Sequence, residues 1–540
     1  MRTSPAESSQ SPRFGGSSTV NVLLLGTGGR EHALALKLRQ SPRLGTLHVQ
    51  PDANAGLLSL GTPVDVPVSI REIYRLNQYC DKHTIGLVVI GPEQPLADGF
   101  ADRLASPTRH VFGPSAAGAR LEADKAYAKE LMRAAAVPTA EASAFTDADA
   151  AIAAIEASCL ADDRFLQMRD LQTRVERAPM LRRAIDALRR IGDAALARTT
   201  YAAADMTLLK DILSSSKGQG RASNPLPSEQ NLKELAVSIA RLYALDLPSL
   251  PVIKACGLAA GKGVVVPRTL AEAAEAIDQI MRRRIFGDAG ATVLIEEKLK
   301  GREVSVLAIT DGRSILVLPP CQDHKRLLDE DDGPNTGGMG AYCPSDALDD
   351  AMMSRVERDV LVPILDVMRR EGIEYKGVLY AGLMLTHAGP KVLEFNCRFG
   401  DPECQPLMAR LESDLIEIML ATCEGRLADA DVRWTDLHAC SVVIASPGYP
   451  VKPRVGAAIS GIEDASSIDG VCVIHAATRR ESDGTLITTG GRVLAVTALG
   501  ASLEDARRRA YDGCARIRFD GMHYRRDIGS QPLVAARSQS

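Results

Sequence analysis

Two strand-like segments around residue 390 constrain the fold of this chain more than any other feature. Residues 378–385 and 391–395 are rich in apolar side chains and flank a His-Ala-Gly-Pro turn. Because alternate residues of a β-strand face the same side, Glu394 and Asn396 would present their side-chain oxygens together. Hard cations such as Mg²⁺ take oxygen ligands and often share them with phosphate, so the pattern predicts a metal site. A solvated glutamate at a strand end is the alternative, and the Arg-Phe-Gly-Asp-Pro-Glu segment that follows favours the metal site.

The composition narrows the class of protein. With 45% apolar and 24% charged residues, the 540-residue chain is typical of a globular protein with three or four domains. No apolar run approaches the roughly 18 residues that span a bilayer, so a membrane protein is not expected. The formal net charge of −4 argues against a nucleic-acid surface, although local fields still permit small anionic substrates.

The cysteines and the chain ends indicate a compartment. The 11 cysteines are scattered without a Cys-x-x-Cys pair, which predicts reduced thiols inside a cell. Residues 1–18 are rich in Ser, Pro and Gly and lack the apolar stretch of a secretory signal. We therefore expect disordered tails at 1–18 and 531–540 and a cytoplasmic location, with organelle targeting by the first tail left open.

Strands and helices alternate through residues 19–122. Strands are predicted by apolar composition at residues 19–25, 47–49 and 85–90. The alternation predicts a parallel, doubly wound sheet with ligands at the carboxyl ends of its strands. A dinucleotide fold is disfavoured because Glu31 occupies the third glycine position of the Gly-x-Gly-x-x-Gly motif. Gly28 and Gly29 could instead seat an anion at a helix start, although a plain strand-to-helix turn is the simpler explanation of the glycines alone.

Residues 159–248 differ from their surroundings in composition, which indicates an insertion. They are rich in Ala, Arg and Leu with helical spacing, and a Ser/Gly-rich link at 214–220 interrupts them. We expect the insertion to be partly helical and partly disordered. Four arginines are predicted to form a solvated helix face rather than a binding patch: Arg182, Arg183, Arg189 and Arg190.

A glycine-rich segment between predicted strands at 251–254 and 264–266 is expected to cover a phosphate. It contains Gly257, Gly261, Lys262 and Gly263. It is not a Walker A loop, because no Ser or Thr follows the lysine and a strand comes next.

Two further regions are candidates for ligand contacts. A predicted strand at 293–299 leads into a second strand that begins at Glu303. This hinge could offer backbone groups to the edge of a purine and a carboxylate to a ribose. An exposed acidic strand end is an equally good explanation. Segments 322–326 and 333–342 are polar, and the second has four glycines that allow close approach of the backbone to a ligand. We expect a long functional loop there.

Taken in this order, the motifs resemble the glycinamide ribonucleotide synthetase family of the ATP-grasp superfamily. The matching segments are residues 28–32, 91–93, 254–263, 322–326, 333–342, 393–403 and 490–494. The resemblance covers about residues 20–158 and 249–530, and it departs from the family pattern at the insertion and at the Pro-Asp-Ala-Asn-Ala-Gly turn of residues 51–56.

The resemblance implies an α/β and α+β multidomain chain. It implies an N-terminal Rossmann-like (pre-ATP-grasp) domain at 19–122, a two-lobed ATP-grasp domain at 123–437 with the atypical insertion 159–248, and a small C-terminal α+β domain at 438–530. It also implies an ATP-dependent ligase that joins glycine to 5-phosphoribosylamine through glycyl phosphate in purine biosynthesis. The implied ligands are these small molecules and Mg²⁺ or Mn²⁺. Binding to nucleic acid or to a membrane is not expected, and the resemblance implies a monomer or weak homodimer. Because the fused domains of animal homologues are missing, a single activity is expected.

The resemblance further assigns roles to residues. It places ATP against Lys125, Lys254, Gly257, Gly261, Lys262, Gly263, Glu296, Glu297, Leu299 and Glu303. It makes Glu394 and Asn396 the metal ligands, and it places Asp323, Lys325 and Arg398 around glycine and the acyl phosphate. The substrate contacts it implies are Gly28, Gly29, Glu31, Gly91, Glu93, Gly337, Gly338, Met339 and Gly340.

Three alternatives stay open on the sequence. A different ATP-grasp ligase, such as a biotin-dependent carboxylase, would share the Glu-x-Asn pair. A non-catalytic relative would keep the fold as a binding module, and an NAD oxidoreductase is weakened by Glu31.

Overall fold

A computed structural model describes residues 19–160, 162–175, 178–215, 227–259 and 261–530. The tails predicted at 1–18 and 531–540, and most of the link predicted at 214–220, lie outside the described residues. Within these ranges, no helix is long and apolar enough to cross a membrane.

The N-terminal sheet is parallel, as the alternation of strands and helices predicts. Its order is β3 (Thr62–Pro63), β2 (Leu44–Val49), β1 (Val20–Leu25), β4 (Ile85–Ile90) and β5 (His110–Phe112). Its helices are α1 (Gly29–Leu38), α2 (Ala55–Leu60), α3 (Ile73–Lys82), α4 (Glu93–Ala97), α5 (Phe100–Leu104) and α6 (Ala116–Ala123). The Gly91 amide donates to the Leu25 carbonyl at 3.0 Å, so the turns after β1 and β4 lie side by side.

Two antiparallel four-stranded sheets form the centre of the molecule. One has the order β11 (Ile315–Val317), β10 (Arg302–Thr310), β16 (Gly377–Thr386) and β17 (Gly389–Asn396). The other has the order β6 (Ala142–Phe145), β9 (Val293–Glu296), β7 (Val252–Ala255) and β8 (Val264–Val265). The predicted strands around the metal pair and the glycine-rich segment are therefore present. Val306 and Ala381 of the first sheet share a buried core with Leu23 and Val88 of the N-terminal sheet.

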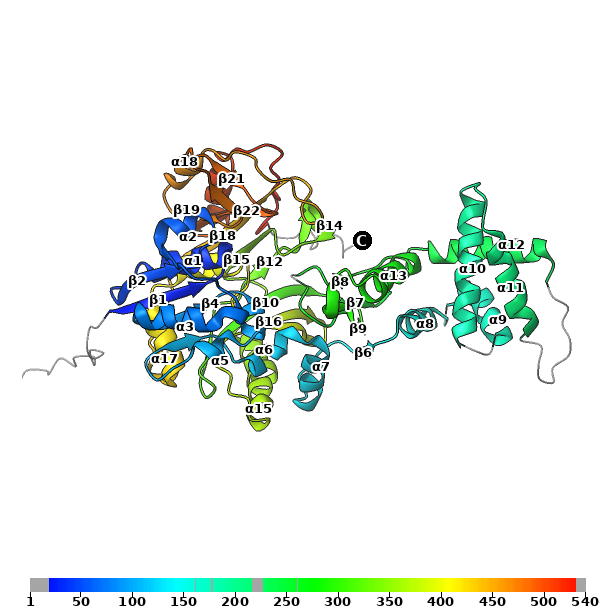
Figure 1. Cartoon of the computed structure of the whole chain (residues 1–540), viewed down its shortest axis with the longest axis horizontal. Helices are drawn as coiled ribbons and strands as arrows, with labels where there is room; N and C mark the ends of the chain where they lie inside the picture. The colour runs from blue at the N-terminus through cyan, green and yellow to red at the C-terminus, as the bar shows by residue number, and fades with distance from the viewer. Residues whose placement is uncertain (1–18, 161, 176–177, 216–226, 260, 531–540) are drawn as a thin grey trace, which may run out of the picture.

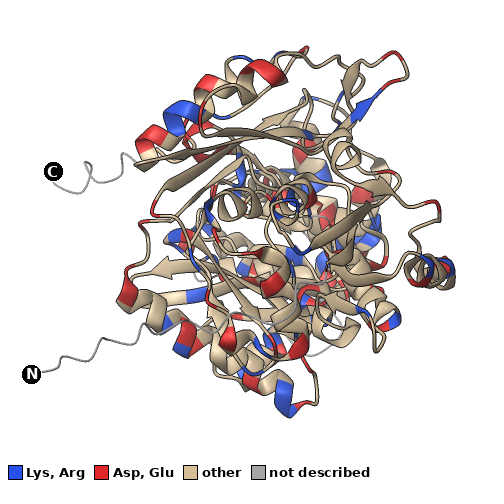
Figure 2. Cartoon of the chain, turned by 90° about the vertical axis from the view of Figure 1, so that its left-hand side faces the viewer, with Lys and Arg blue, Asp and Glu red and all other residues tan. Residues whose placement is uncertain are grey.

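Helices cover the first of these sheets and join it to the C-terminal part. They are α7 (Lys125–Ala134), α14 (Asp350–Val356), α15 (Val362–Arg370), α16 (Cys404–Arg410) and α17 (Leu415–Glu424). Acidic and basic residues are interspersed over the side of the molecule that Figure 2 presents, without a continuous region of one sign.

The C-terminal sheet takes strands from two parts of the chain. Its order is β12 (Gln322–Asp323), β15 (Gly340–Cys343), β18 (His438–Ala445), β22 (Arg492–Gly500) and β19 (Val471–His475). Helices α18 (Ile462–Ser466) and α19 (Leu503–Cys514) and the small hairpin of β20 (Thr478–Arg480) and β21 (Leu486–Thr488) complete this part.

The prediction of a long loop between residues 322 and 342 was wrong. The segment contains four short strands: β12, β13 (Arg326–Leu328), β14 (Asp332–Asn335) and β15. Strand β15 pairs with β18 along its length, from Gly340 opposite Val442 to Cys343 opposite Ala439. Its partner β18 comes from a distant part of the chain, so local polarity and glycine content concealed the strand.

The insertion is helical where the structure describes it. Helices α9 (Leu166–Arg174), α10 (Ala178–Leu196), α11 (Ala203–Ser215) and α12 (Glu229–Tyr243) form a bundle that projects from one end of the molecule (Figure 1). The prediction of a solvated arginine face is wrong for Arg182, which is 4% exposed and pairs with Glu156 and Asp186. The periodicity of α10 turns this residue inward, towards acidic partners that the local sequence does not reveal.

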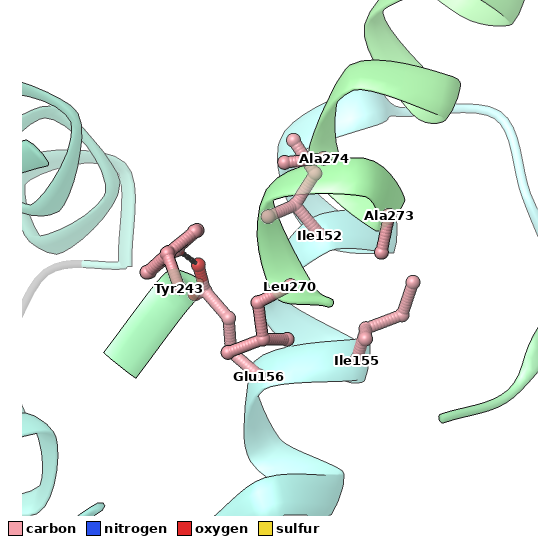
Figure 3. A pocket seen from close by; sticks show the side chains of 7 residues that line it. All are labelled: Ile152, Ile155, Glu156, Tyr243, Leu270, Ala273 and Ala274. Carbon is pink, nitrogen blue, oxygen red and sulfur yellow. Dashed lines mark hydrogen bonds between the residues drawn. The ribbon is translucent and has the colours of Figure 1, made fainter. Parts of the chain in front are cut away.

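The bundle shares its core with the neighbouring lobe. At its base, Glu156 of α8 (Ala148–Cys159) and Tyr243 of α12 form a hydrogen bond beside Leu270 of α13 (Leu270–Ile277), as Figure 3 shows. Arg182 pairs with the same carboxylate and lies 3.3 Å from the Tyr243 hydroxyl. Ile155 belongs to the apolar cluster that surrounds this network. The insertion is thus packed onto the lobe rather than loosely tethered to it.

Candidate active site

Strand β17 presents the predicted metal ligands. Glu394 and Asn396 are two residues apart on this strand and therefore share a face, opposite Gly382 and Tyr380 of β16. The Arg398 guanidinium follows and donates from Nη2 to Asn396 Oδ1 at 3.1 Å. This confirms the shared orientation of the three polar residues that strand parity predicts.

Cations surround the Glu394 carboxylate. Its Oε1 lies 3.7 Å from Lys325 Nζ, and Lys254 and Lys125 also act on it electrostatically. Burial by itself would raise the pKa of Glu394, but Lys325, Lys254, Lys125 and Arg398 together lower it to about 2. The carboxylate is therefore ionised at neutral pH and able to bind a cation.

The oxygen donors fit a divalent cation shared with a phosphate. Among the described residues, no three acidic, His or Cys side chains gather as a metal shell of their own. Glu394 and Asn396 would supply part of an oxygen shell, which is the usual arrangement when substrate phosphates and water supply the rest.

Two further lysines stand close to this face. Lys254 on β7 lies 2.7 Å from Glu296 Oε2 and donates to the Leu393 carbonyl at 3.0 Å. Lys125 begins α7 and donates to the Gly257 carbonyl at 3.2 Å. Burial lowers the pKa of Lys125, and the Glu394 carboxylate opposes that effect. Lysines from three separate parts of the chain thus converge on one anionic position.

Lys129 is a buried partner that our sequence analysis missed. Its Nζ lies 3.3 Å from Glu296 Oε1, so Glu296 is held between Lys129 and Lys254. Lys125 and Lys129 are spaced i,i+4 on α7, and this spacing was the signal that could have identified the second lysine.

The other residues predicted around adenosine do not all point the same way. Glu303 is half-exposed and lies 3.4 Å from Lys325, on the side of the metal pair. Glu297 instead points to Lys391 at 3.3 Å, and Leu299 is half-buried in the connector.

The glycine-rich segment between β7 and β8 approaches the rest of the site. Gly257 fits tightly, because a Cβ there would lie 2.6 Å from Ala289 Cα. Gly261 has a φ of +73°, and a Cβ on it would lie 3.9 Å from Gly337 Cα. Gly263 faces Ala255 and Ala259, and Lys262 is exposed. The segment therefore reaches across to residues 333–342.

Asp323 is a half-buried acid with an unused oxygen. Its Oδ1 has no hydrogen-bond partner among the residues that the structure describes. Burial raises the pKa of Asp323 well above its usual range, and the Glu403 carboxylate adds to the effect. A Cβ on Gly338 would lie 2.8 Å from this oxygen and would collide with Pro402, so only glycine fits at φ +108°.

The rest of the 337–340 segment is divided between the site and the core. Gly337 donates its amide to the Tyr449 hydroxyl at 3.0 Å and accepts from Arg492. Met339 is fully buried in the C-terminal core, and Gly340 packs against Ser441 and Ile528. The Met339 side chain therefore faces the core, and Gly340 is enclosed by core atoms.

The N-terminal wall contains a chain of ion pairs. Glu31 Oε1 lies 2.7 Å from Arg30 Nε, and Glu31 Oε2 accepts from the Gly28 amide at 2.8 Å. Gly91 has no room for a Cβ because the Glu31 carboxylate fills that space. Glu93 lies 3.2 Å from Arg398 Nε; burial raises its pKa, but Arg398 and Arg30 lower it to about 2.

Several residues of this wall were not predicted from the sequence. Arg398 Nη2 pairs with Glu122 at 2.8 Å, and Arg492 Nη2 pairs with Asp401 at 3.0 Å. Asp401 and Arg492 lie in segments that carry the family resemblance, which could have identified them. Glu122 stands at the end of an ordinary helix, and nothing in its local sequence marks it.

Three families of known domains match the chain. Residues 20–122 match "Phosphoribosylglycinamide synthetase, N domain", residues 221–404 match its ATP-grasp (A) domain, and residues 439–531 match its C domain. These matches confirm the predicted fold class.

Whole-chain relatives agree with the domain matches. The phosphoribosylamine–glycine ligase of Rhodopirellula baltica is 42% identical over 520 residues, which cover 96% of this chain and 99% of that protein. The trifunctional purine biosynthetic protein adenosine-3 of Homo sapiens is 39% identical over 514 residues, or 95% of this chain, and the chain spans 42% of its length.

Solved structures give the same result. The crystal structure of phosphoribosylamine–glycine ligase from Thermotoga maritima has a TM-score of 0.64 at 28% identity and covers 94% of this chain and all of that one. A second match is the biotin carboxylase domain of the Hydrogenobacter thermophilus 2-oxoglutarate carboxylase, with a TM-score of 0.57 at 13% identity. The match covers 93% of this chain and 91% of that domain, and at this identity it shows a shared fold alone. The chain belongs to the phosphoribosylglycinamide synthetase family.

Proposed function

We propose that this protein is an ATP-dependent ligase that joins glycine to 5-phosphoribosylamine, giving glycinamide ribonucleotide, ADP and phosphate in purine biosynthesis. The observation that carries the proposal is the ionised Glu394 on β17, which is surrounded by Lys325, Lys254 and Lys125. Family membership supports the choice of substrates.

The chemistry explains why such a site is needed. A glycine carboxylate is a poor electrophile, and its oxygen is a poor leaving group. Transfer of the ATP γ-phosphoryl group gives glycyl phosphate, and the amine of phosphoribosylamine then displaces phosphate to form the amide. Phosphoryl transfer depends mostly on positioning and on neutralising charge, which the lysines can provide.

The chain's residues divide this work between them. Lys125 and Lys254 would bind the ATP phosphates, because their Nζ atoms stand beside the glycine-rich segment and β17. Glu394 and Asn396 would hold Mg²⁺ or Mn²⁺, which when bound offsets the negative charge of the phosphates. Glu303 would accept hydrogen bonds from the ribose of ATP.

The connector after β9 would bind adenine. The Glu296 carboxylate is occupied by Lys129 and Lys254, so its contribution to ATP would come from the backbone. Leu299 would pack against the base. Glu297 points to Lys391 and would contribute less.

The part of the site where glycine is phosphorylated and then joined to the amine would lie between Arg398 and Asp323. The Lys325 ammonium and the Arg398 guanidinium would orient the glycine carboxylate, and Asp323 has a free oxygen for the glycine amino group. Closure of the segment at 257–263 over this region would exclude water and limit hydrolysis of glycyl phosphate.

The test is ADP release in a coupled assay. ATP, Mg²⁺, glycine and freshly generated phosphoribosylamine are combined with the protein, and each is omitted in turn. We expect ADP and glycinamide ribonucleotide only in the complete mixture. ADP release that needs another acceptor, such as bicarbonate, would assign the protein to a different ATP-grasp reaction.

A further inference from the structure

Glu122 connects the N-terminal part of the chain to the end of the strand that carries the predicted metal ligands. It lies near the end of α6 and is 8% exposed. Leu121 of the same helix shares a buried core with Phe395 of β17 and with Cys397, which follows that strand. The Glu122 carboxylate is therefore brought to residues 395–398 by the packing of α6 against β17.

Both oxygens of this carboxylate accept hydrogen bonds from residues 397 and 398. Oε2 accepts from the Cys397 amide at 2.7 Å and from the Cys397 thiol at 3.1 Å. Oε1 lies 2.8 Å from Arg398 Nη2. All three partners are donors, and an ionised carboxylate satisfies them because it accepts on both oxygens. Glu122 thus holds the backbone directly after Asn396 together with the side chain beside it.

Arg398 extends this contact to Asn396. The same Nη2 donates to Asn396 Oδ1 at 3.1 Å. The last torsion of an asparagine side chain has only a broad preference of its own, so a hydrogen bond to its oxygen decides which way that oxygen faces. Arg398 Nε lies 3.2 Å from Glu93 Oε2, so Glu93 pairs with the guanidinium from another side. Glu122 differs from Glu93 because it also binds the backbone amide of Cys397.

The same stretch of chain carries a lysine that faces the glycine-rich segment. Lys125 follows Glu122 by three residues; its amide donates to the Cys256 carbonyl at 2.9 Å, and its Nζ donates to the Gly257 carbonyl at 3.2 Å. Asp124 caps the start of α7, because its Oδ1 accepts from the Tyr127 amide at 3.1 Å. The junction of α6 and α7 therefore fixes the end of β17 relative to the start of the glycine-rich segment.

We infer that Glu122 is a positioning residue for the metal ligands, an inference that rests on the metal role of Glu394 and Asn396 in the proposed function. Glu122 acts through Cys397 and Arg398. It holds the end of β17 so that the two ligands present their oxygens to one cation. Loss of a partner that orients a metal ligand typically costs about 10–100-fold in metal affinity.

Glu122→Gln tests the inference with almost no change in size. An amide has one acceptor oxygen and a donor NH₂ group, so it can accept from residue 397 or from Arg398, and its NH₂ group then faces a donor. Mn²⁺ binding is measured by electron paramagnetic resonance with a non-hydrolysable ATP analogue present. We expect the Kd for Mn²⁺ to rise at least about ten-fold, with the affinity for the analogue in EDTA changed less than about two-fold. An unchanged Kd for Mn²⁺ would overturn the inference.

Glu156→Gln is the matched control for the loss of a buried carboxylate that pairs with an arginine. Glu156 is 7% exposed and pairs with Arg182 at the base of the bundle, beside Ile155 of a different apolar cluster (Figure 3). We expect this variant to unfold at a lower urea concentration but to keep its Kd for Mn²⁺ within about two-fold of the wild type. If it weakened Mn²⁺ binding as much as Glu122→Gln does, the effect would be a general loss of stability and the inference would fail.

Glu122→Asp provides a second measure should Glu122→Gln not fold. It keeps the charge but is one methylene group shorter, so it can reach residue 397 or Arg398 but not both. We expect its Kd for Mn²⁺ to rise about three-fold or more, and an unchanged value would contradict the inference.

These binding measurements contain neither glycine nor phosphoribosylamine. The expected pattern would therefore uphold the inference even if the ligase assay fails. A wild-type protein that binds no Mn²⁺ with the ATP analogue would refute the inference even if ligase activity is present.

Discussion

At the scale of single residues, the site is defined by charges that balance one another at short range. Glu394 is kept ionised by Lys325 and by further cations, and Glu93 is kept ionised by Arg398 and Arg30. Such partly buried, paired groups are costly to assemble, and they are typical of sites that neutralise a substrate's charge.

Glu394→Ala removes the carboxylate on which the three lysines converge. We expect kcat to fall by at least about 100-fold, because loss of one group that stabilises charge in a transition state costs about 2.7–4 kcal/mol of barrier. Glu374→Ala is the control, since the side chain of this glutamate is 73% exposed and pairs with Lys376 at the surface. Steady-state ADP release measures both, and near-normal turnover of Glu394→Ala would reject the metal role.

Glu93 makes stability depend on pH in a predictable direction. Its pKa is lowered from 4.5 to about 2, so its ionised form stabilises the folded protein above pH 4.5, and this contribution is lost as the pH falls from 4.5 towards 2. The wild type should therefore exceed Glu93→Gln in free energy of unfolding by up to about 3 kcal/mol at pH 7. Urea denaturation at several pH values should show this difference shrinking below pH 4.5. A difference that stays constant down to the lowest pH would show that the ion pairs are not its source.

Gly338 tests whether backbone geometry sets the glycine side of the site. Gly338→Ala would strain a φ of +108° and push a methyl group into Pro402 and the Asp323 carboxylate, so we expect kcat/KM for glycine to fall about ten-fold or more. Gly372→Ala is the matched control: its φ is +77°, but a Cβ there meets no atom of the described residues within 4 Å. Activity assays and thermal unfolding of both proteins separate misplacement of Asp323 from general strain. Equal activity of the two variants would count against this account.

At the scale of secondary-structure elements, the projecting bundle is held by its base. Helices α8, α12 and α13 meet there around the buried hydrogen bond between Tyr243 and Glu156 (Figure 3), and Arg182 of α10 pairs with the same carboxylate. The insertion is therefore expected to move with the lobe that carries β7, β8 and the glycine-rich segment.

Arg182→Met leaves the Glu156 carboxylate buried without its cation. Because removing one partner of a buried ion pair leaves an uncompensated charge, we expect a loss of about 3–5 kcal/mol in the free energy of unfolding. Arg183→Met, one residue along the same helix and exposed, should change it by no more than about 0.5 kcal/mol. Chemical denaturation compares the two. Similar stabilities would mean that the network contributes little to holding the bundle.

At the scale of the whole molecule, the sequence predicted the strands and site residues that are determined by local residue patterns. Apolar runs located β1, β4, β10, β16 and β17, and strand parity placed Glu394 and Asn396 together. It did not predict β15, because this strand pairs with β18 about a hundred residues away, nor β12, which in turn pairs with β15; such pairing is decided by tertiary contacts. Glu122 was missed for the same reason, since its role depends on Arg398 being folded against it. The monomer or weak homodimer, the cytoplasmic location and the exact domain limits stay predictions.

The most direct test of this account is a crystal structure of the protein with a non-hydrolysable ATP analogue and Mn²⁺. We predict an anomalous difference peak for Mn²⁺ within about 2.5 Å of side-chain oxygens of both Glu394 and Asn396, with the terminal phosphates between Lys125 and Lys254. A triphosphate bound elsewhere, or a metal ion that contacts neither Glu394 nor Asn396, would contradict the account.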